Sequence, residues 1–464
     1  MGTHCGYVVE VKDLRPHSNA DKLQIATFFG NDTCVGLDVK VGDKGIYFPT
    51  DLQLSTAYCE ANNLVRKKDD AGNEIGGFLD PIKRNVKTIR LRGEPSDGIY
   101  CPIESLAFTG IDLKDLTVGM TIDTVNGVEI CQKYIPRTKS SGGVKQGNKT
   151  RKKKVPVAPL FAEHADTEQL AYNLHAFRPG DLVEITLKMH GTSGRTGYLP
   201  VLKGYKRSLL DRILRREGTP IYDWGYVSGT RRVVLESYEG GFYGDNSFRE
   251  KHSKTFEGKL LKGETVYYEI VGFTDSGAPI MGDGDNRKIH DKEFLKQYGD
   301  TTRFSYGCAP DGGDEPDVHD ENCGAPWVVK GPRSDIYVYR MTMTNEDGAV
   351  VEYTPDYMRY RCEQMGVKAV PVFIQDIIPH EYQDNSGEWV GVDAGEWIKN
   401  LAEKYYDGPD PVGKTHIREG VVVRIVNKPK FCAYKHKNFA FKVIEGIVKE
   451  DATAPDMEEA QDAE

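Results

Sequence analysis

The segment KMHGTSGR, residues Lys188 to Arg195, places a lysine directly before a glycine-containing turn. Glycines such as Gly191 let backbone amides approach a phosphate closely. A lysine amine is a poor nucleophile at its usual pKa of about 10.4, and burial or a neighbouring cation activates it by lowering that pKa. Alone this pattern is weak, because a surface lysine before a turn looks the same.

Four later segments strengthen the interpretation through their order. YYEIVG places Glu269 at a strand end, and IYVY is an aromatic strand that contains Tyr339. The segment EGVVV starts with Glu419, and YKHKN places Lys435 and Lys437 on one face of a strand, because residues i and i+2 share a face. Together the five segments favour a nucleotide site.

In this order the motifs resemble those of the covalent nucleotidyltransferase superfamily of polynucleotide ligases and capping enzymes. KMHGTSGR, with His190 where DNA ligases tend to have Asp, and YKHKN are similar to the RNA ligase branch. The stretch from Ile336 to Phe373 is similar to the aromatic segment and following helix of phage-type RNA ligases. An N-terminal OB module before such a domain resembles the Deinococcus-type RNA ligase family, and the resemblance covers about residues 1–447.

The resemblance implies an ATP-dependent RNA ligase. Lys188 would attack the α-phosphate of ATP and release pyrophosphate, AMP would pass to a 5′-phosphate on RNA, and a 3′-hydroxyl would then displace AMP. Each step is an in-line displacement at phosphorus, in which positioning and charge neutralisation supply most of the catalysis. The implied cofactors are ATP and Mg²⁺ (or Mn²⁺). The implied partner is RNA, with a nicked duplex or an RNA/DNA hybrid among the possible substrates.

The resemblance also implies roles for single residues. Lys435 and Lys437 would hold the α-phosphate, Glu269 would bind ribose hydroxyls, and Tyr339 would stack on adenine. Glu419 would help to hold the divalent metal, through waters or directly. Each role has a structural alternative. The two lysines could lie on a solvated strand face, the two glutamates could simply be solvated, and Tyr339 could be a core aromatic.

Two arginines are further candidates, and one position departs from the family. Arg231 would bind ribose or the 5′-phosphate, with Arg232 as its competitor, and Arg195 would approach the same phosphates. Related ligases often have Glu immediately before the lysine, where this chain has Leu187. A polar contact to adenine would be missing there unless backbone groups replace it.

Mixed strands and helices without a βαβ rhythm predict an α+β fold with antiparallel sheets over residues 159–447, as in an ATP-grasp-like nucleotidyltransferase domain. Turn signals predict strands at Leu182–Leu187 and Ile336–Thr344. A helix is expected to follow Thr354-Pro355 and to end at Gly366, and another is expected at Trp397–Tyr406. The basic stretch 206–216 is a helix candidate, either as a solvated face or as an RNA contact.

Residues 1–131 predict a small β-barrel or sandwich, with strands that include Tyr7–Val11, Leu23–Phe28 and Thr88–Leu91. The stretch HSNADKLQIATFFG resembles OB-type tRNA-binding modules, whose groove suits oligonucleotides. A β-domain that only packs on its neighbour is the alternative.

Charge is unevenly distributed along the 464 residues. Residues 448–464 are expected to be an acidic disordered tail; from Lys449 onward it holds seven acids and one base, or −6 of the net −9. The expected linker, 132–158, contains eight bases and no acid between Arg137 and Lys154. Such a block is either a solvated segment or a foothold on phosphates.

Composition excludes several classes of protein. No apolar run reaches the roughly 18 residues of a membrane span, and the N-terminus does not resemble a secretory signal. Nine scattered cysteines without a CxxC pair give no support for zinc and fit a reducing cytoplasm, although Cys308 and Cys323 could meet. The sequence contains no HExxH or GxSxG motif, so a protease or other hydrolase has no support.

Two alternatives stay open. A DNA ligase or capping enzyme would usually carry a C-terminal OB domain, and only about two dozen residues follow Asn438. That short remainder argues against both enzymes, and labelling of Lys188 by ATP but not GTP would speak against a capping enzyme. A non-catalytic RNA-binding protein would use the OB-like module and the basic linker. The binding protein predicts no covalent AMP and full RNA affinity in Lys188→Ala.

Overall fold

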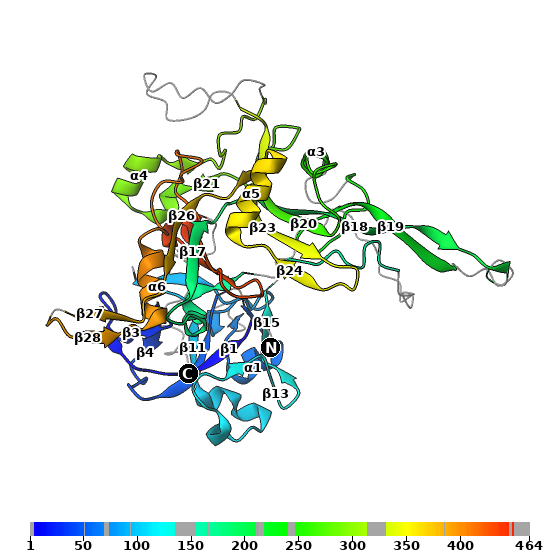
Figure 1. Cartoon of the computed structure of the whole chain (residues 1–464). Helices are drawn as coiled ribbons and strands as arrows, with labels where there is room; N and C mark the ends of the chain where they lie inside the picture. Colours follow the sequence, from blue (N-terminus) through cyan, green and yellow to red (C-terminus); the bar gives the residue numbers. More distant parts are fainter. Residues whose placement is uncertain are drawn as a thin grey trace. The chain divides into compact units, whose positions relative to one another are not determined.

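The computed structural model describes residues 4–50, 52–68, 74–92, 94–134, 155–164, 167–209, 211, 218–239, 246–312, 331–384, 386–444 and 448–449 (Figure 1). The chain forms two compact units, residues 1–146 with 442–464 and residues 147–441. This division differs from the expected one, because the chain after residue 441 returns to the first unit. Among the described residues, no helix is long and apolar enough to cross a membrane.

The first unit consists mainly of short antiparallel strands. They are β1 (Gly6–Glu10), β2 (Leu14–Pro16), β3 (Leu23–Phe28), β4 (Asn31–Gly36), β5 (Lys44–Phe48), β6 (Leu52–Leu54), β7 (Arg66–Lys68), β8 (Glu74–Gly76), β9 (Thr88–Leu91), β10 (Glu94–Ser96), β11 (Ile99–Pro102), β12 (Thr121–Ile122), β13 (Thr124–Val125), β14 (Val128–Glu129), β15 (Cys131–Lys133) and β31 (Val448–Lys449), with helix α1 (Thr56–Ala61).

These strands form several small sheets. The largest has the order β11-β5-β1-β12, and β2-β3-β4 is a separate antiparallel sheet. Strand β31 pairs in parallel with β9. The expected OB barrel is not confirmed, since the described strands of this unit do not close into one barrel. Its core includes Val8, Ile46, Phe48 and Tyr58, all fully buried.

The second unit contains two larger sheets. The first has the order β16 (Glu168–Gln169), β30 (Ala433–Lys437), β29 (Gly420–Ile425), β17 (Leu182–Leu187) and β26 (Val372–Ile377). The second has the order β19 (Thr219–Gly229), β18 (Thr192–Lys206), β20 (Glu264–Gly272), β23 (Ser334–Thr344) and β24 (Val350–Glu352), with β25 (Lys368–Ala369) beside β23. All neighbours are antiparallel except β16–β30 and β23–β25, which agrees with the expected α+β class.

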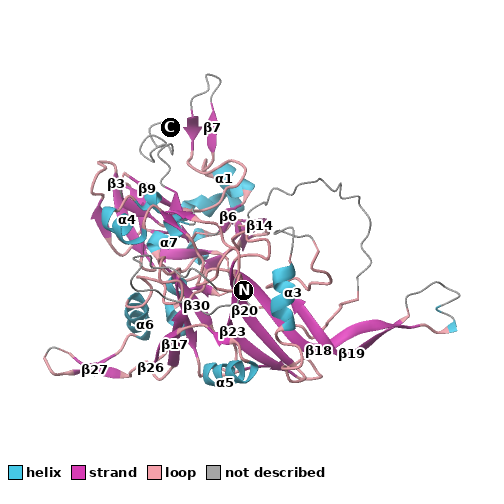
Figure 2. Cartoon of the chain, turned by 90° about the horizontal axis from the view of Figure 1, so that it is seen from above, coloured by secondary structure: helices cyan, strands magenta, loops and turns pink. Residues whose placement is uncertain are grey.

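Helices and two small two-stranded sheets complete the described part of this region. The helices are α3 (Ser247–Lys254), α4 (Lys292–Tyr298), α5 (Pro355–Met365) and α6 (Ala394–Glu403), and the sheets pair β21 (Gly284–Asp285) with β22 (Thr301–Thr302) and β27 (Glu381–Gln383) with β28 (Trp389–Gly391). Helix α7 (Phe439–Ile444) begins here, and its residues from Lys442 onward belong to the first unit. Strands β18 and β19 continue together as a long hairpin beyond β20, as Figure 2 shows.

Alternation on β17 creates the two faces that matter for function. Val183 and Ile185 are buried in a core with Ile398 and Leu401 of α6. Residues two apart on a strand share a face, so Glu184 and Thr186 point the opposite way, and both line a pocket. Hydrophobic burial on one face therefore fixes which side chains of β17 reach the pocket.

Local capping signals place the helices. Thr354 caps α5 by accepting from the Tyr357 N–H, and Gly366 ends the helix in the left-handed conformation, both as expected. Helix α6 begins earlier than the expected Trp397, because Asp393 caps it by accepting from the Glu396 N–H.

The ends of the expected linker are structured. Strand β15 extends to Lys133 and pairs with β6, while Ala158 packs with Leu199 and Val201. Residues 135–154, most of the expected acidic tail, Cys323 and most of the basic stretch 206–216 lie outside the described residues. Lys206 itself ends strand β18.

Candidate active site

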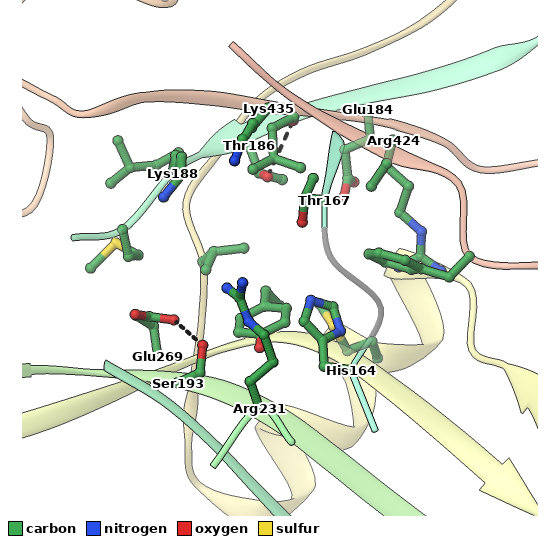
Figure 3. Close-up of a pocket in the computed structure, with 18 of the residues that line it drawn as sticks. His164, Thr167, Glu184, Thr186, Lys188, Ser193, Arg231, Glu269, Arg424 and Lys435 are labelled. Atoms are coloured by element: carbon green, nitrogen blue, oxygen red, sulfur yellow. Dashed lines mark hydrogen bonds between the residues drawn. The ribbon is translucent and has the colours of Figure 1, made fainter. Parts of the chain in front are cut away.

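A pocket of about 270 Å³ lies between the two sheets of the second unit (Figure 3). Strands β17, β29 and β30 contribute one wall, and β18, β20 and β23 contribute the other. Six of the nine residues singled out in the sequence line this pocket: Lys188, Arg231, Glu269, Tyr339, Lys435 and Lys437. Segments up to 249 residues apart in sequence therefore meet at one site.

Lys188 is held at the end of β17. The pairing of β17 with β29 continues one residue further, because the Lys188 N–H donates to the Gly420 carbonyl at 3.0 Å. This bond fixes the backbone of Lys188. Its side chain is 23% exposed and reaches a buried carboxylate, with Nζ 2.6 Å from Glu419 Oε1. The lysine is thus mostly enclosed yet open to the pocket.

Glu419 connects the two lysine-bearing strands although it does not itself line the pocket. Its Oε1 is also 2.9 Å from Lys437 Nζ, and Oε2 lies 3.4 Å from His190 Nδ1. Burial opposes ionisation of this carboxyl, but Lys188 and Lys437 outweigh it and hold the pKa of Glu419 well below its usual range. Glu419 is therefore ionised and bridges Lys188 and Lys437.

The turn after Lys188 is packed tightly against β20. A Cβ on Gly191 would lie 2.3 Å from the Ile270 carbonyl oxygen and 3.0 Å from Glu269 Cγ. The ring of the preceding His190 is buried edge-on against the rings of Phe304 and Phe441, and the His190 backbone N–H donates to the Tyr306 hydroxyl at 2.8 Å. In this structure Gly191 therefore serves close packing beside Glu269.

A bulge orients the opposite wall. Tyr267 pairs with Arg340 and Tyr268 pairs with Val338, so Tyr339 is an extra residue in β23. Val338 faces the core, and Tyr339 lines the pocket. The sequence pattern does not contain this bulge, although the aromatic strand was predicted.

The carboxyl group of Glu269 has a raised pKa. Its carboxylate accepts from the Ser193 hydroxyl at 3.2 Å (Figure 3). Burial raises the pKa of Glu269 to about 7, even though Lys188 and Arg231 favour its charged form. Such a carboxyl in a cleft is typical of functional sites.

Arg231 points into the pocket from the loop after β19 (Figure 3). The Arg231 carbonyl accepts from the His164 N–H at 3.1 Å, and His164 also lines the pocket. Its competitor, Arg232, is exposed and does not line this pocket. His164, Ser193 and Tyr306 were not predicted. His164 and Tyr306 are isolated residues without a motif, whereas Ser193 lies within KMHGTSGR and could have been singled out from it.

Arg195 requires a correction, since it does not reach the pocket. Its side chain is among the largest fully buried ones, and its guanidinium lies 4.1 Å from the centre of the Phe161 ring. It donates to the carbonyls of Thr230 at 2.9 Å and Phe161 at 3.1 Å, and to that of Ala162. Arg195 thus fastens the segment before His164 to the end of β19.

The carboxylates do not form a ready-made metal cage. No group of three His, Cys, Asp or Glu side chains among the described residues is arranged to hold a metal ion. Glu419 is already engaged by two ammonium groups. Mg²⁺ usually retains waters and binds through one or two carboxylates together with substrate phosphates. Glu419 and Glu269 therefore fit an ion that arrives with a triphosphate.

Comparison with known proteins places this geometry in a structural context. No protein-family model and no curated protein sequence matches the chain. Among solved structures, it is similar to Naegleria gruberi RNA ligase as a Lys→Ala mutant with ATP and Mn, at 16% identity and a TM-score of 0.54, covering 96% of this chain and 99% of that one. The chain shares the fold of that RNA ligase.

The same ligase with pyrophosphate matches at 16% identity and a TM-score of 0.53, covering 95% of this chain and 98% of that one. A Lys→Met mutant with AMP and Mn matches at 15% identity and 0.51, covering 94% and 97%. The similarity therefore extends over nearly the whole chain at low sequence identity.

Proposed function

We propose that this protein is an ATP-dependent RNA ligase that joins 3′-hydroxyl and 5′-phosphate ends through a lysyl-AMP on Lys188. The observation that carries the proposal is the convergence of Lys188, Lys435 and Lys437 on one pocket, opposite Glu269 and Tyr339. A lysine anchored by its backbone can be presented to a phosphorus atom with little loss of orientation. The shared fold with an RNA ligase supports this choice of reaction.

The proposed chemistry uses three lysines on one wall of the pocket and Glu269 and Tyr339 on the other wall. After its ammonium group has lost one proton to water, Lys188 Nζ attacks the α-phosphorus and the bond to pyrophosphate breaks. The nitrogen then gives up a second proton, to water or to the departing pyrophosphate, as the phosphoramidate forms. Lys435 and Lys437 would neutralise the charge that develops on the phosphate oxygens. Glu269 would accept from ribose hydroxyls, Tyr339 would stack on the base, and Arg231 would bind ribose or the RNA 5′-phosphate.

A divalent ion, Mg²⁺ or Mn²⁺, would shield the triphosphate and favour attack at phosphorus. Glu419 is the residue that would hold it, through water or directly. Glu419 is paired with Lys188 and Lys437, so its carboxylate would be shared between these ammonium groups and the ion.

RNA is the proposed polymer, and RNA repair is the proposed task. The first unit would contact RNA as an OB-like module, although its described strands do not form a closed barrel. A nicked duplex or an RNA/DNA hybrid suits a protein that must hold two ends in line.

Joining of a nicked RNA duplex with a labelled 5′-phosphate tests the proposal. The wild-type chain with ATP and Mg²⁺ should yield the joined strand, and Lys188→Ala should accept only RNA that is already adenylylated. Covalent labelling of Lys188 by GTP rather than ATP, without joining of the strands, would indicate a capping-type enzyme. RNA binding without joining or adenylylation would indicate a binding protein instead.

A further inference from the structure

We propose that the outer part of the β18–β19 hairpin is an arm that binds the phosphate backbone of double-helical RNA, about ten base pairs away from the ends being joined. The arm consists of residues 198–206 of β18 and residues 219–226 of β19. This inference rests on the proposed function and deepens it, because it adds an RNA-binding surface outside the pocket.

The arm extends one wall of the pocket away from the site. Strand β20 pairs with β18 from Thr192 to Gly197, whereas β19 pairs with β18 as far as Lys206 (Figure 2). The inner end of β18 carries Ser193, which lines the pocket, and Arg231 of the pocket lies two residues after the end of β19. The ribbon of β18 and β19 therefore starts at the site and leads away from it.

One face of the arm is aromatic and is engaged in packing. The rings of Tyr198 and Tyr226 stack with their centres 4.7 Å apart, and the Trp224 ring lies 5.8 Å from that of Tyr198. The Tyr226 hydroxyl accepts from the Gly258 N–H at 2.6 Å, and Lys262 Nζ lies 5.2 Å from the centre of the Trp224 ring. Because these rings contact one another and their neighbours, this face serves packing rather than the stacking of unpaired bases.

The opposite face carries two lysines, which a β-bulge brings to the same side. A Cβ on Gly225 would lie 2.9 Å from Lys203 Nζ, so the Lys203 side chain lies on the Gly225 face of the ribbon. The register with β19 skips Lys203, and Lys206 beyond the bulge lies opposite Thr219. Thr219 and Gly225 share a face of β19, because alternate residues of a strand point the same way. Lys203 and Lys206 therefore project from one face.

This lysine face is exposed and basic. Both Lys203 and Lys206 are exposed, and neither forms an ion pair with a carboxylate in the part of the chain that the structure describes. Asp223 shares the face at its inner end, so the positive charge gathers toward the tip of the arm. In the sequence, residues 203–217 hold six basic and two acidic residues, although the net charge of the chain is −9. Such a local excess of positive charge complements a polyanion.

The separation of cations from aromatic rings favours a double helix as the ligand. A duplex stacks its bases inside and presents phosphates along its outer edge, where lysines bind them without reading the sequence. Lys203 lies ten residues beyond Ser193 on β18, which corresponds to roughly 33 Å of extended strand. At about 3.4 Å per nucleotide, that length equals about ten base pairs. A duplex with shorter flanks would end before it reached the lysines.

The experiment measures binding of nicked RNA duplexes to the full chain by fluorescence anisotropy at several salt concentrations, without ATP. One duplex has flanks of about 20 base pairs on each side of the nick, and the other has flanks of about 6, which fall short of the distance estimated above. The test variant Lys203→Gln/Lys206→Gln removes two charges from the arm. The matched control Lys399→Gln/Lys404→Gln removes two charges at α6, where Lys399 is paired with Glu403.

On the long duplex, the arm variant should show a weaker dependence on salt than the wild type and the control. Each phosphate contact contributes about 0.9 to the slope of log affinity against log salt, so the slope should fall by roughly 2 and the affinity by about tenfold at about 0.1 M salt. On the short duplex, all three proteins should have the same affinity and slope. Melting curves establish that each variant is folded.

The possible failures are distinguishable. Equal salt slopes of the wild type and the folded arm variant on the long duplex would overturn the assignment of the arm. An equally large loss on the short duplex, or with an unpaired RNA strand of the same length, would overturn it too. Labelling of the wild type with ATP is measured in parallel. A long-duplex effect without a covalent AMP would contradict the ligase proposal while supporting the arm, whereas AMP on Lys188 without that effect would overturn the arm alone.

Discussion

The Glu419 carboxylate lies 2.6 Å from the Lys188 ammonium nitrogen, within a site that is almost closed to solvent on the Glu419 side. The same oxygen contacts Lys437, so one negative charge orients two of the proposed catalytic cations. A buried charge that loses its partner is strongly unfavourable. Glu419 is therefore central to both the geometry and the charge balance of the pocket.

Glu419→Gln should slow adenylylation of Lys188 about a hundredfold or more, because a preorganised charge at the reacting centre is lost. Single-turnover labelling with ATP measures the rate. Glu250→Gln, at an exposed helical ion pair with Lys254, is the control and should react like the wild type. A wild-type rate in Glu419→Gln would refute the role given to this carboxylate.

Glu269→Gln should stabilise the fold in a pH-dependent manner. Burial raises the pKa of Glu269 to about 7 from an ordinary value of 4.5, so its folded form favours the proton. Below pH 4.5 both states are protonated; between there and about pH 7 the wild type loses stability as pH rises, and above pH 7 the penalty is constant.

The stability difference between Glu269→Gln and wild type should therefore grow from near zero at pH 4.5 to a plateau above pH 7. The plateau should be roughly 1–2 kcal/mol, less than the full shift implies, because the side chain lines an open pocket. Urea unfolding at several pH values measures it. A difference that is constant with pH would contradict the raised pKa.

Arg195→Lys should destabilise the protein by about 3 kcal/mol, because a lysine cannot satisfy three carbonyls at once while buried. Urea unfolding compares it with Arg303→Lys, where the exposed ion pair with Asp283 should contribute almost nothing. Loss of adenylylation at unchanged stability would instead support a direct phosphate contact for Arg195.

Gly191→Ala should lower stability by about 1–3 kcal/mol and reduce adenylylation, because the new Cβ would force Ile270 and Glu269 apart from the turn. Gly282→Ala is the control, since a Cβ there meets nothing within 4 Å. Melting temperatures measure the change in stability of each variant, and single-turnover labelling with ATP measures the change in its adenylylation rate. Equal behaviour of the two would show that the turn is not tightly packed.

Features with local causes were predictable from the sequence. Strands β3, β9 and β17 have the predicted ends, because alternation and turn residues mark them. The caps of α5 were predictable for the same reason. The motif order also indicated which lysines and carboxylates belong near one site. Lys188, Lys435, Lys437 and Glu269 line one pocket, and Glu419 contacts two of these lysines.

Features that depend on distant contacts were not predictable. Tyr306 meets His190 across 116 residues, and only tertiary packing creates that bond. The bulge at Tyr339 depends on its register with β20, and Arg195 turns inward because Phe161 and Thr230 offer carbonyls there. Likewise, nothing local in the sequence indicates that Val448–Lys449 pairs with β9.

The most direct measurement is the intact mass of the full chain after incubation with ATP and Mg²⁺, followed by peptide mapping. We predict a mass gain of one AMP, located on Lys188 and absent from Lys188→Ala. Lys368→Ala, at an exposed ion pair with Asp335, should be labelled like the wild type. An unmodified wild-type chain, or AMP attached to another residue, would contradict the account.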